Sequence, residues 1–261
     1  MDLKNLLYEK KGHIGIVKFN RPKQLNAIDS DTAEEIIEVF DAMDRDPEIR
    51  CVILTGEGPK AFSAGGDIRE EAEKDCLKAY DFIQLGTKAL AAVEQFRAPV
   101  IAAVNGYCLG GGTEFAVACD IRIAADNAKM GSPEISLGLL PGWGGSQRLP
   151  RIIGMSKAKV FMFTGDMVKA PEALEMGLVD QVVPADQLLD KAMELAQKIA
   201  KRPPRAIRYI KTLVNEGMQT DLQRALRMEG AMAVHLFDTK DNKEACAAFL
   251  EKREPNAFTG W

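Results

Sequence analysis

The chain has 261 residues, of which 46% are hydrophobic and 28% charged, and it carries a net charge of −4. This composition is ordinary for a globular protein, and the acidic balance gives no general attraction to nucleic acid or to an anionic membrane. The N-terminus lacks a basic segment followed by an apolar one, and no apolar run reaches the roughly 18 residues of a membrane span. Five cysteines without a Cys-x-x-Cys pair are typical of free thiols in a reducing compartment. We therefore expect a cytoplasmic protein.

The first part of the chain alternates predicted strands with predicted helices. Runs rich in β-branched residues predict strands at 13–19, 50–55, 100–104, 121–125 and 179–183. A short strand from Lys129 is expected to run into an irregular loop that ends at Pro141. Apolar periodicity predicts helices at 31–44, 68–96, 113–118, 147–153, 157–164 and 171–176. Asp31 and Glu34 are placed to form a capping box at the first helix.

Strand signals stop after Ala185. Helices are predicted at 186–201, 203–216, 222–237 and 243–251, with Asp241 and Glu244 capping the last. We divide the chain into an α/β core at 1–195 and a helical region at 196–261. A helical region of about 60 residues is small for a core of its own. It should therefore pack on the α/β core or on a neighbouring subunit.

The segment 105–120 contains the clearest candidate for a chemical site. It follows a predicted buried strand, and the three consecutive glycines 110–112 precede a short apolar helix that carries Glu114. Glycines allow backbone geometries that a Cβ would block, and the first N–H groups of a helix lack intrahelical partners. Such a turn could polarise a carbonyl group while holding a carboxylate beside it.

A second glycine-rich segment, 61–67, and a second acid, Glu134, complete this pattern. Glu114 could be a solvated helix acid, but its apolar neighbours favour a buried carboxylate, which needs a reason to be there. For Glu134 alone, a solvated loop acid is at least as good an interpretation. Two carboxylates in one pocket would separate their pKa values, leaving one as acid and one as base.

Other kinds of site are disfavoured by the sequence. It contains neither a P-loop motif nor a G-x-G-x-x-G motif after the first strand. His13 and His235 lack metal-ligand spacing, so we expect no metal site. Ser63 and Ser136 have no evident histidine partner, which disfavours a Ser-His-Asp hydrolase.

Several long motifs together resemble the crotonase (enoyl-CoA hydratase/isomerase) superfamily, and within it the short-chain enoyl-CoA hydratases most closely. In chain order the motifs are FNRPKQLNA (19–27), AFSAGGDI (61–68), NGYCLGGGTE (105–114), GSPEISLG (131–138), PGWGGSQRL (141–149), LEMGLV (174–179) and FLEKR (249–253). The resemblance covers nearly the whole chain. It implies an α/β spiral of repeated strand–strand–helix turns with a C-terminal helical region, assembling as trimers or as pairs of trimers.

The resemblance also implies an acyl-CoA thioester substrate and no separate cofactor, because coenzyme A is part of the substrate. The oxyanion-hole amides would be those of Gly66 and Gly111, where relatives often have alanine at the first position. Glutamates at both 114 and 134 are the hydratase pattern, with water adding across the C2=C3 bond of a 2-enoyl-CoA. By the same resemblance, Glu114 would activate the water and protonated Glu134 would deliver a proton to C2.

Further positions would bind the CoA or acyl parts of the substrate: Lys23, Leu25, Ala64, Gly65, Asp67, Ile68, Gly110, Trp143 and Lys252. For each lysine a solvated surface charge is an equal alternative. Trp143 could line the acyl pocket, favouring a short or flat acyl group, or it could plug a loop.

Two other functions stay open at this point. One is another crotonase-type reaction, such as hydration of a cyclic enoyl-CoA or double-bond isomerisation. The other is a protein that binds, for example, RNA on the same fold without turnover, which the glutamate pair and the acidic balance disfavour. The sequence names neither the acyl group, the pathway, nor the physiological direction.

Overall fold

Two β-sheets organise the α/β part of the molecule, a computed structural model that describes residues 3–260. The larger sheet has six strands in the order β1 (Leu6–Lys11), β2 (Ile14–Phe19), β3 (Cys51–Gly56), β5 (Val100–Val104), β7 (Ile121–Ala125) and β10 (Gln181–Val183). The smaller has four, in the order β4 (Ala61–Ser63), β6 (Tyr107–Leu109), β8 (Lys129–Gly131) and β9 (Val168–Lys169). Among the strands of residues 3–260, only the β1–β2 and β8–β9 pairs are antiparallel. The predicted α/β class is confirmed.

Successive turns in the middle of the chain contribute a strand to the large sheet, a short strand to the small sheet, and then a helix. Thus β3 and β4 precede α2 (Ile68–Glu71) and α3 (Cys76–Glu94), and β5 and β6 precede α4 (Gly111–Ala118). Because β4 and β6 are parallel neighbours, the segments that follow them leave the small sheet at the same edge. The topology therefore brings the two glycine-rich segments together.

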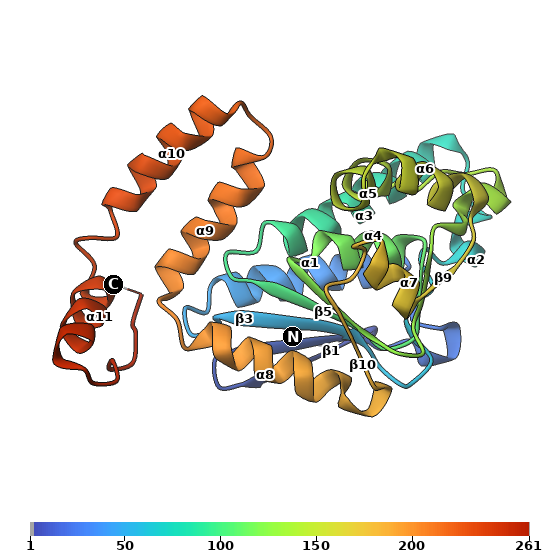
Figure 1. Ribbon diagram of the computed structural model, residues 1–261. Coiled ribbons are helices and arrows are strands. Elements are labelled where there is room, and N and C mark those ends of the chain that lie inside the picture. The colour runs from blue at the N-terminus through green and yellow to red at the C-terminus, as the bar shows by residue number, and fades with distance from the viewer. Residues whose placement is uncertain (1–2, 261) are drawn as a thin grey trace.

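Apolar side chains cover both faces of the large sheet. On one face, α1 (Ser30–Asp44), α3 and α4 bury the main core, in which Phe19 lies edge-on to both Phe62 and Phe115. On the other face lies α8 (Leu188–Ala200), whose buried alanines pack against β3, β5 and β7 (Figure 1). With both faces covered, the central strands read as continuous apolar runs.

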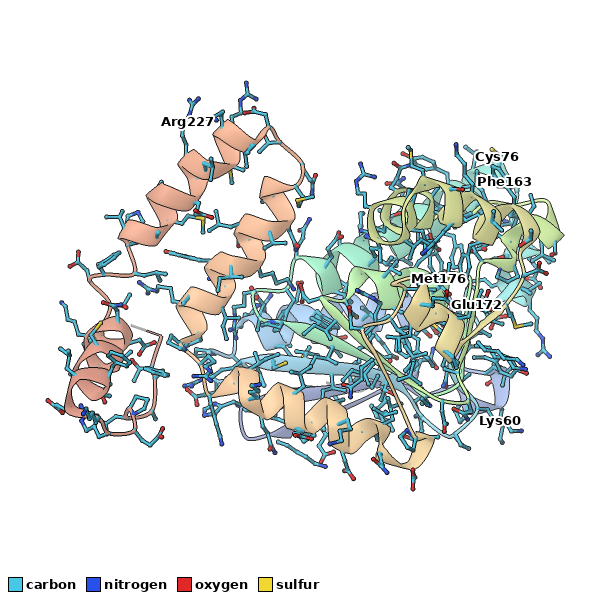
Figure 2. The ribbon with its side chains drawn as sticks, viewed as in Figure 1. Lys60, Cys76, Phe163, Glu172, Met176 and Arg227 are labelled. Carbon is cyan, nitrogen blue, oxygen red and sulfur yellow. The ribbon has the colours of Figure 1, made fainter. Side chains whose placement is uncertain are left out.

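The C-terminal helices leave the α/β body after α8. α9 (Pro204–Gly217) and α10 (Leu222–Val234) pack as a helical pair, and α11 (Lys240–Glu251) lies beyond them (Figure 1). α8 runs unbroken through the boundary that we placed at 195/196. The side chains of α10, including Arg227, stand away from the α/β body (Figure 2). Within residues 3–260, no helix combines the length and the apolar character needed to cross a bilayer.

The remaining helices follow β8 in the chain, and α5 and α6 lie on the side of the α/β body away from α9–α11 (Figure 1). They are α5 (Gly145–Ile153), α6 (Met155–Thr164) and α7 (Ala170–Glu175), with 3-10 turns η1 (Pro22–Gln24), η2 (Pro133–Leu137) and η3 (Ala185–Gln187). α5 packs against both α4 and α6. The turn that precedes α5 therefore lies beside α4, which carries Glu114.

The structure corrects several local predictions. Strands β1, β4, β6 and β9 were not predicted, because β1 alternates weakly and the other three are only two or three residues long. The predicted helix 68–96 is two helices, since Asp75 starts a new one by accepting from the N–H of Lys78. Both capping predictions are wrong: Asp29, not Asp31, caps α1, and Thr239 caps α11. Asp241 instead accepts the N–H groups of Thr259 and Gly260, which ties the chain end to α11.

Candidate active site

The two glycine-rich turns meet at one edge of the small sheet. Ala61 pairs with Tyr107 and Ser63 with Cys108. Gly65 (φ +95°) and Gly110 (φ +52°) adopt backbone conformations that L side chains rarely take. A Cβ built on Gly65 would lie 3.0 Å from the backbone nitrogen of Gly111, so glycine is needed for the close approach as well.

Each turn leaves one backbone donor without a partner. Gly65 donates to Ser63 Oγ, Asp67 to the carbonyl of Ile28, and Gly110 to the carbonyl of Gly131. Within residues 3–260, no hydrogen bond is donated by the N–H of Gly66 or of Gly111. Both glycines line the same cavity. Two such donors in adjacent turns are suited to one carbonyl oxygen that gains negative charge.

Glu114 is buried in the first turn of α4, with 3% of its surface exposed. Its Oε1 accepts two backbone hydrogen bonds, from Trp143 at 2.8 Å and from Gly145 at 2.7 Å. Burial raises the pKa of Glu114 to about 7, with the nearby carboxylate of Glu134 adding to the rise and the Gly145 and Trp143 N–H groups opposing it. The solvated alternative is therefore excluded, and this carboxyl group changes its charge near neutral pH.

Glu134 reaches the same cavity from η2. Its Oε2 accepts from Ser132 Oγ at 2.7 Å, while its Oε1 is buried and has no hydrogen-bond partner among the described residues. A Cβ built on Gly110 would lie 3.3 Å from this Oε1. A buried acceptor without a partner is unfavourable in an empty site. Glu134 therefore presents an unused oxygen to the glycine turn.

The cavity that joins these groups measures about 340 Å³ and has mostly apolar walls. Trp143, 4% exposed, contacts the rings of Phe82 and Phe115 at centroid distances of 5.4 and 6.2 Å. Its indole also fills the space that a Cβ on Gly86 or Gly111 would need, at 2.2 and 2.3 Å. Trp143 therefore fills a buried slot and also lines the cavity, and its effect on the acyl group stays a prediction.

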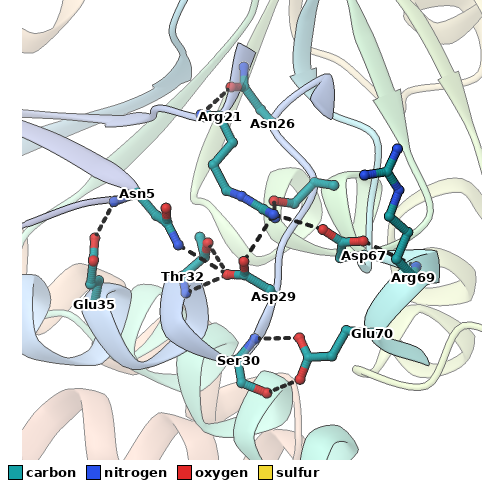
Figure 3. Close-up of polar contacts among 11 residues, drawn as sticks. Asn5, Arg21, Asn26, Asp29, Ser30, Thr32, Glu35, Asp67, Arg69 and Glu70 are labelled. Carbon is teal, nitrogen blue, oxygen red and sulfur yellow. Dashed lines mark hydrogen bonds and ion pairs between the residues drawn. The ribbon is translucent and has the colours of Figure 1, made fainter. Parts of the chain in front are cut away.

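A polar network ties the Gly66 turn to the segment that precedes α1 (Figure 3). Arg21 donates to Asp67 at 2.8 Å and forms an ion pair with Asp29 at 3.0 Å. Asp67 also caps α2 through the N–H of Arg69, and Ser30 donates twice to Glu70. The side chain of Asp67 is thus used in this network and does not line the cavity.

The other predicted binding residues are distributed unevenly. Ala64, Gly65, Ile68 and Gly110 line the cavity with the residues above. The carbonyl of Leu25 accepts from the N–H of Ala64 at 2.9 Å, which places this residue beside the turn. Lys23 is exposed on η1. Lys252 ends α11, in the extension that projects from the α/β body (Figure 1), and does not reach the cavity of its own chain.

Among the cavity residues that sequence reasoning missed are Glu71, Lys74 and Phe82. They lie in the stretch that was predicted as one helix, where acids and lysines are ordinarily solvated. The signal that could have found Glu71 was the glycine at 66, since it leaves room for a side chain against the turn. No group of three or more His, Cys, Asp or Glu residues between 3 and 260 is placed to hold a metal ion.

Comparison with known proteins shows the family of the chain. Residues 9–260 match the family model described as enoyl-CoA hydratase/isomerase. The chain belongs to the enoyl-CoA hydratase/isomerase family. It is 46% identical to a short-chain-enoyl-CoA hydratase of Clostridium acetobutylicum, over 99% of both chains, and 44% identical to a crotonyl-CoA hydratase of Syntrophomonas wolfei, over 98% of both.

The fold is shared with solved structures of this enoyl-CoA hydratase/isomerase family. The crystal structure of an enoyl-CoA hydratase from Bacillus anthracis superposes with a TM-score of 0.96 at 40% sequence identity. The match covers 99% of this chain and 100% of that one. Both the predicted family and the predicted fold are therefore confirmed.

Proposed function

We propose that the protein is an enoyl-CoA hydratase that reversibly adds water to the C2=C3 bond of a short-chain 2-enoyl-CoA, giving a 3-hydroxyacyl-CoA. One observation carries the proposal: Glu114 and Glu134 share a cavity with the free N–H groups of Gly66 and Gly111. The relatives named as short-chain-enoyl-CoA and crotonyl-CoA hydratases support the same activity.

The two free N–H groups would bind the thioester oxygen. When water attacks C3, the π electrons of the double bond shift towards C2 and the negative charge develops on that oxygen. Fixed backbone donors in a cavity with apolar walls stabilise such a charge without reorganising, and one donor of this kind contributes about 10²–10³-fold to kcat. This charge stabilisation depends on the backbone, so it is available whichever acyl chain is bound.

The two carboxyl groups would handle the protons. Two N–H groups hold Oε1 of Glu114, which leaves its other oxygen to accept a proton from the attacking water. Glu134, in its protonated form, would deliver a proton to C2. Thus an O–C3 and an H–C2 bond form while the water O–H bond breaks, and a proton returned from Glu114 to Glu134 restores the starting state. This division of roles follows the family resemblance.

We also propose that binding and assembly follow the family pattern. Lys23, Leu25 and Ala64 would contact the CoA part, and Lys252 would reach it from a neighbouring subunit. The region 196–261 would carry self-association as trimers or pairs of trimers. In support, large apolar side chains are exposed along α9–α11, among them Ile210, Val214, Met218, Phe237 and Phe249. The five free thiols support a reducing compartment such as the cytoplasm.

The proposal is tested by mixing the purified protein with crotonyl-CoA. Hydration removes the conjugated double bond, so the ultraviolet absorbance of the enoyl thioester falls, and 3-hydroxybutyryl-CoA accumulates. A protein that leaves crotonyl-CoA unchanged, while a known hydratase consumes it in the same buffer, would contradict the proposal.

The pKa of Glu114 predicts the pH dependence of the reaction. Below about 7 the carboxyl group is protonated in the free enzyme and cannot accept a proton from water. We therefore expect kcat/KM to fall about tenfold per pH unit on the acidic side of this value. The measurement is kcat/KM for crotonyl-CoA between pH 5 and 9. A decrease in kcat/KM that begins only near pH 4.5, the ordinary pKa of a glutamate, would contradict the effect of burial on Glu114.

The raised pKa of Glu114 also makes the free energy of unfolding depend on pH. Because the folded pKa of Glu114 is raised, the fold favours the protonated form. The contribution of Glu114 to the free energy of unfolding is therefore complete below its pKa in the unfolded chain, about 4.5, and is lost as the pH rises through about 7. Denaturant unfolding of Glu114→Gln across this range should show a smaller decrease with pH than the parent protein.

We propose that Trp143 limits the length of the acyl chain. Trp143→Ala should raise the kcat/KM ratio of oct-2-enoyl-CoA to crotonyl-CoA at least about tenfold, because the vacated slot admits further methylene groups. Trp143→Phe should give an intermediate ratio. Removing a buried tryptophan also destabilises the fold by about 3–5 kcal/mol, so thermal unfolding must first show that the variant is folded. An unchanged ratio in a folded variant would argue against this role.

A further inference from the structure

Glu71, the last residue of α2, fills a space that Gly66 leaves open. Its Oε1 lies 1.9 Å from where a Cβ on Gly66 would stand, so alanine at 66 and the present position of this carboxylate are incompatible. Glu71 lines the same cavity as Glu114 and Glu134. The cavity therefore contains a third carboxyl group, which the hydration mechanism does not use.

This third carboxylate lacks a counter-ion. Within residues 3–260, Glu71 forms no hydrogen bond through its side chain and no ion pair. Lys74, whose charge acts on Glu71, is paired instead with Glu70 at 2.8 Å and lies 4.8 Å from the centre of the Phe82 ring. Burial raises the pKa of Glu71, and the charges of Glu134, Asp67 and Glu70 raise it further, against the opposing Lys74.

The position of Glu71 is fixed by its neighbours along the chain. Asp67 caps α2 at one end, and Glu70 is held by two hydrogen bonds from Ser30 (Figure 3). The helix has only four residues, so these contacts restrain Glu71 as well. These contacts hold the backbone of Glu71 close to the proposed oxyanion donor Gly66, from where its side chain lines the cavity.

We propose that Glu71 determines acyl specificity by making the cavity reject acyl chains that carry a negative charge. A terminal carboxylate on the substrate would enter apolar surroundings beside an uncompensated anion, where like charges repel far more strongly than in water. A neutral chain of similar size meets no such repulsion. The substrate class is thus short, uncharged 2-enoyl-CoA, and the inference rests on the proposed function.

The test compares two substrates that differ at one end. Pent-2-enoyl-CoA carries a methyl group where glutaconyl-CoA carries a carboxylate. We expect the parent protein to prefer the neutral substrate by at least about 100-fold in kcat/KM. In both Glu71→Gln and Glu71→Met this preference should fall at least about tenfold, because one source of repulsion for the substrate carboxylate has been removed. The matched control is Glu73→Gln, which removes the same charge from an exposed position outside the cavity and should keep the parent preference.

Binding of the saturated analogues separates this inference from the proposed hydratase. Pentanoyl-CoA and glutaryl-CoA are titrated calorimetrically into the same four proteins. A preference that is equal in the parent and in both Glu71 variants overturns the role of Glu71, whether or not the enzyme turns over. Absence of hydration together with a binding preference that depends on Glu71 overturns the hydratase and supports the role of Glu71.

Discussion

Glu114→Gln and Glu134→Gln should each lower kcat for crotonyl-CoA hydration by about 10²–10⁴-fold, the range expected when a proton-transferring group is removed. Glutamine keeps the size of the side chain. At position 114 its amide oxygen can still accept hydrogen bonds from the N–H groups of Trp143 and Gly145. The loss of kcat then measures the missing proton transfer and not a collapse of the cavity. The measurement is the initial rate at saturating substrate, with the KM determined separately.

The double variant sharpens this prediction. If the two carboxyl groups act in one proton circuit, removing both should lower kcat little more than the larger single effect, because such residues act as a unit. Glu172→Gln is the matched control. Glu172 is exposed on α7 (Figure 2), so this variant makes the same chemical change away from the cavity. Full activity in either single variant would remove that glutamate from the mechanism.

Gly111→Ala should lower kcat by at least about 10²-fold, comparable with losing one oxyanion donor. The added Cβ would lie 2.3 Å from Cζ3 of Trp143, so either the indole or the start of α4 must move. Movement of Trp143 would also disturb its N–H bond to Glu114, and movement of α4 would shift the N–H of residue 111. One methyl group thus affects both proposed halves of the chemistry.

Gly230→Ala is the control for this prediction. It makes the same substitution in the helix α10, where a Cβ would meet nothing within 4 Å. Alanine is the better helix former by up to about 1 kcal/mol, so this variant should be at least as stable as the parent and fully active. Parent-like kcat in Gly111→Ala would contradict the close packing of the turn against Trp143.

The sequence predicted best the features that depend on backbone geometry and apolar runs. Gly110 and Gly65 marked the two turns because no other residue suits their φ values and close approach. The central strands were visible because burial on both faces leaves them almost wholly apolar. These two signals predicted the α/β class and the candidate site, whereas the family and its spiral fold were predicted from the resemblance of the seven motifs.

The features that the sequence did not predict depend on tertiary contacts. Asp29 caps α1 in place of Asp31 because its carboxylate also meets Thr32 and Arg21 in three dimensions. Asp67 belongs to a network with Arg21, although its motif position suggested substrate binding. Glu71 enters the cavity only because α2 ends there, and a helix break of this kind is set by the competing Asp75 cap. Local patterns do not contain these partners.

The pairing of β4 with β6 has a consequence for how activity reports on folding. The two proposed oxyanion donors come from successive turns of the chain, and the register of this short pair helps to align them. If β4 shifted by one residue relative to β6, the amino-acid sequence of the site would be unchanged but the two N–H donors would move apart. Hydration rate is therefore a sensitive measure of strand register in this family, able to detect misaligned molecules whose helix content and compactness are normal.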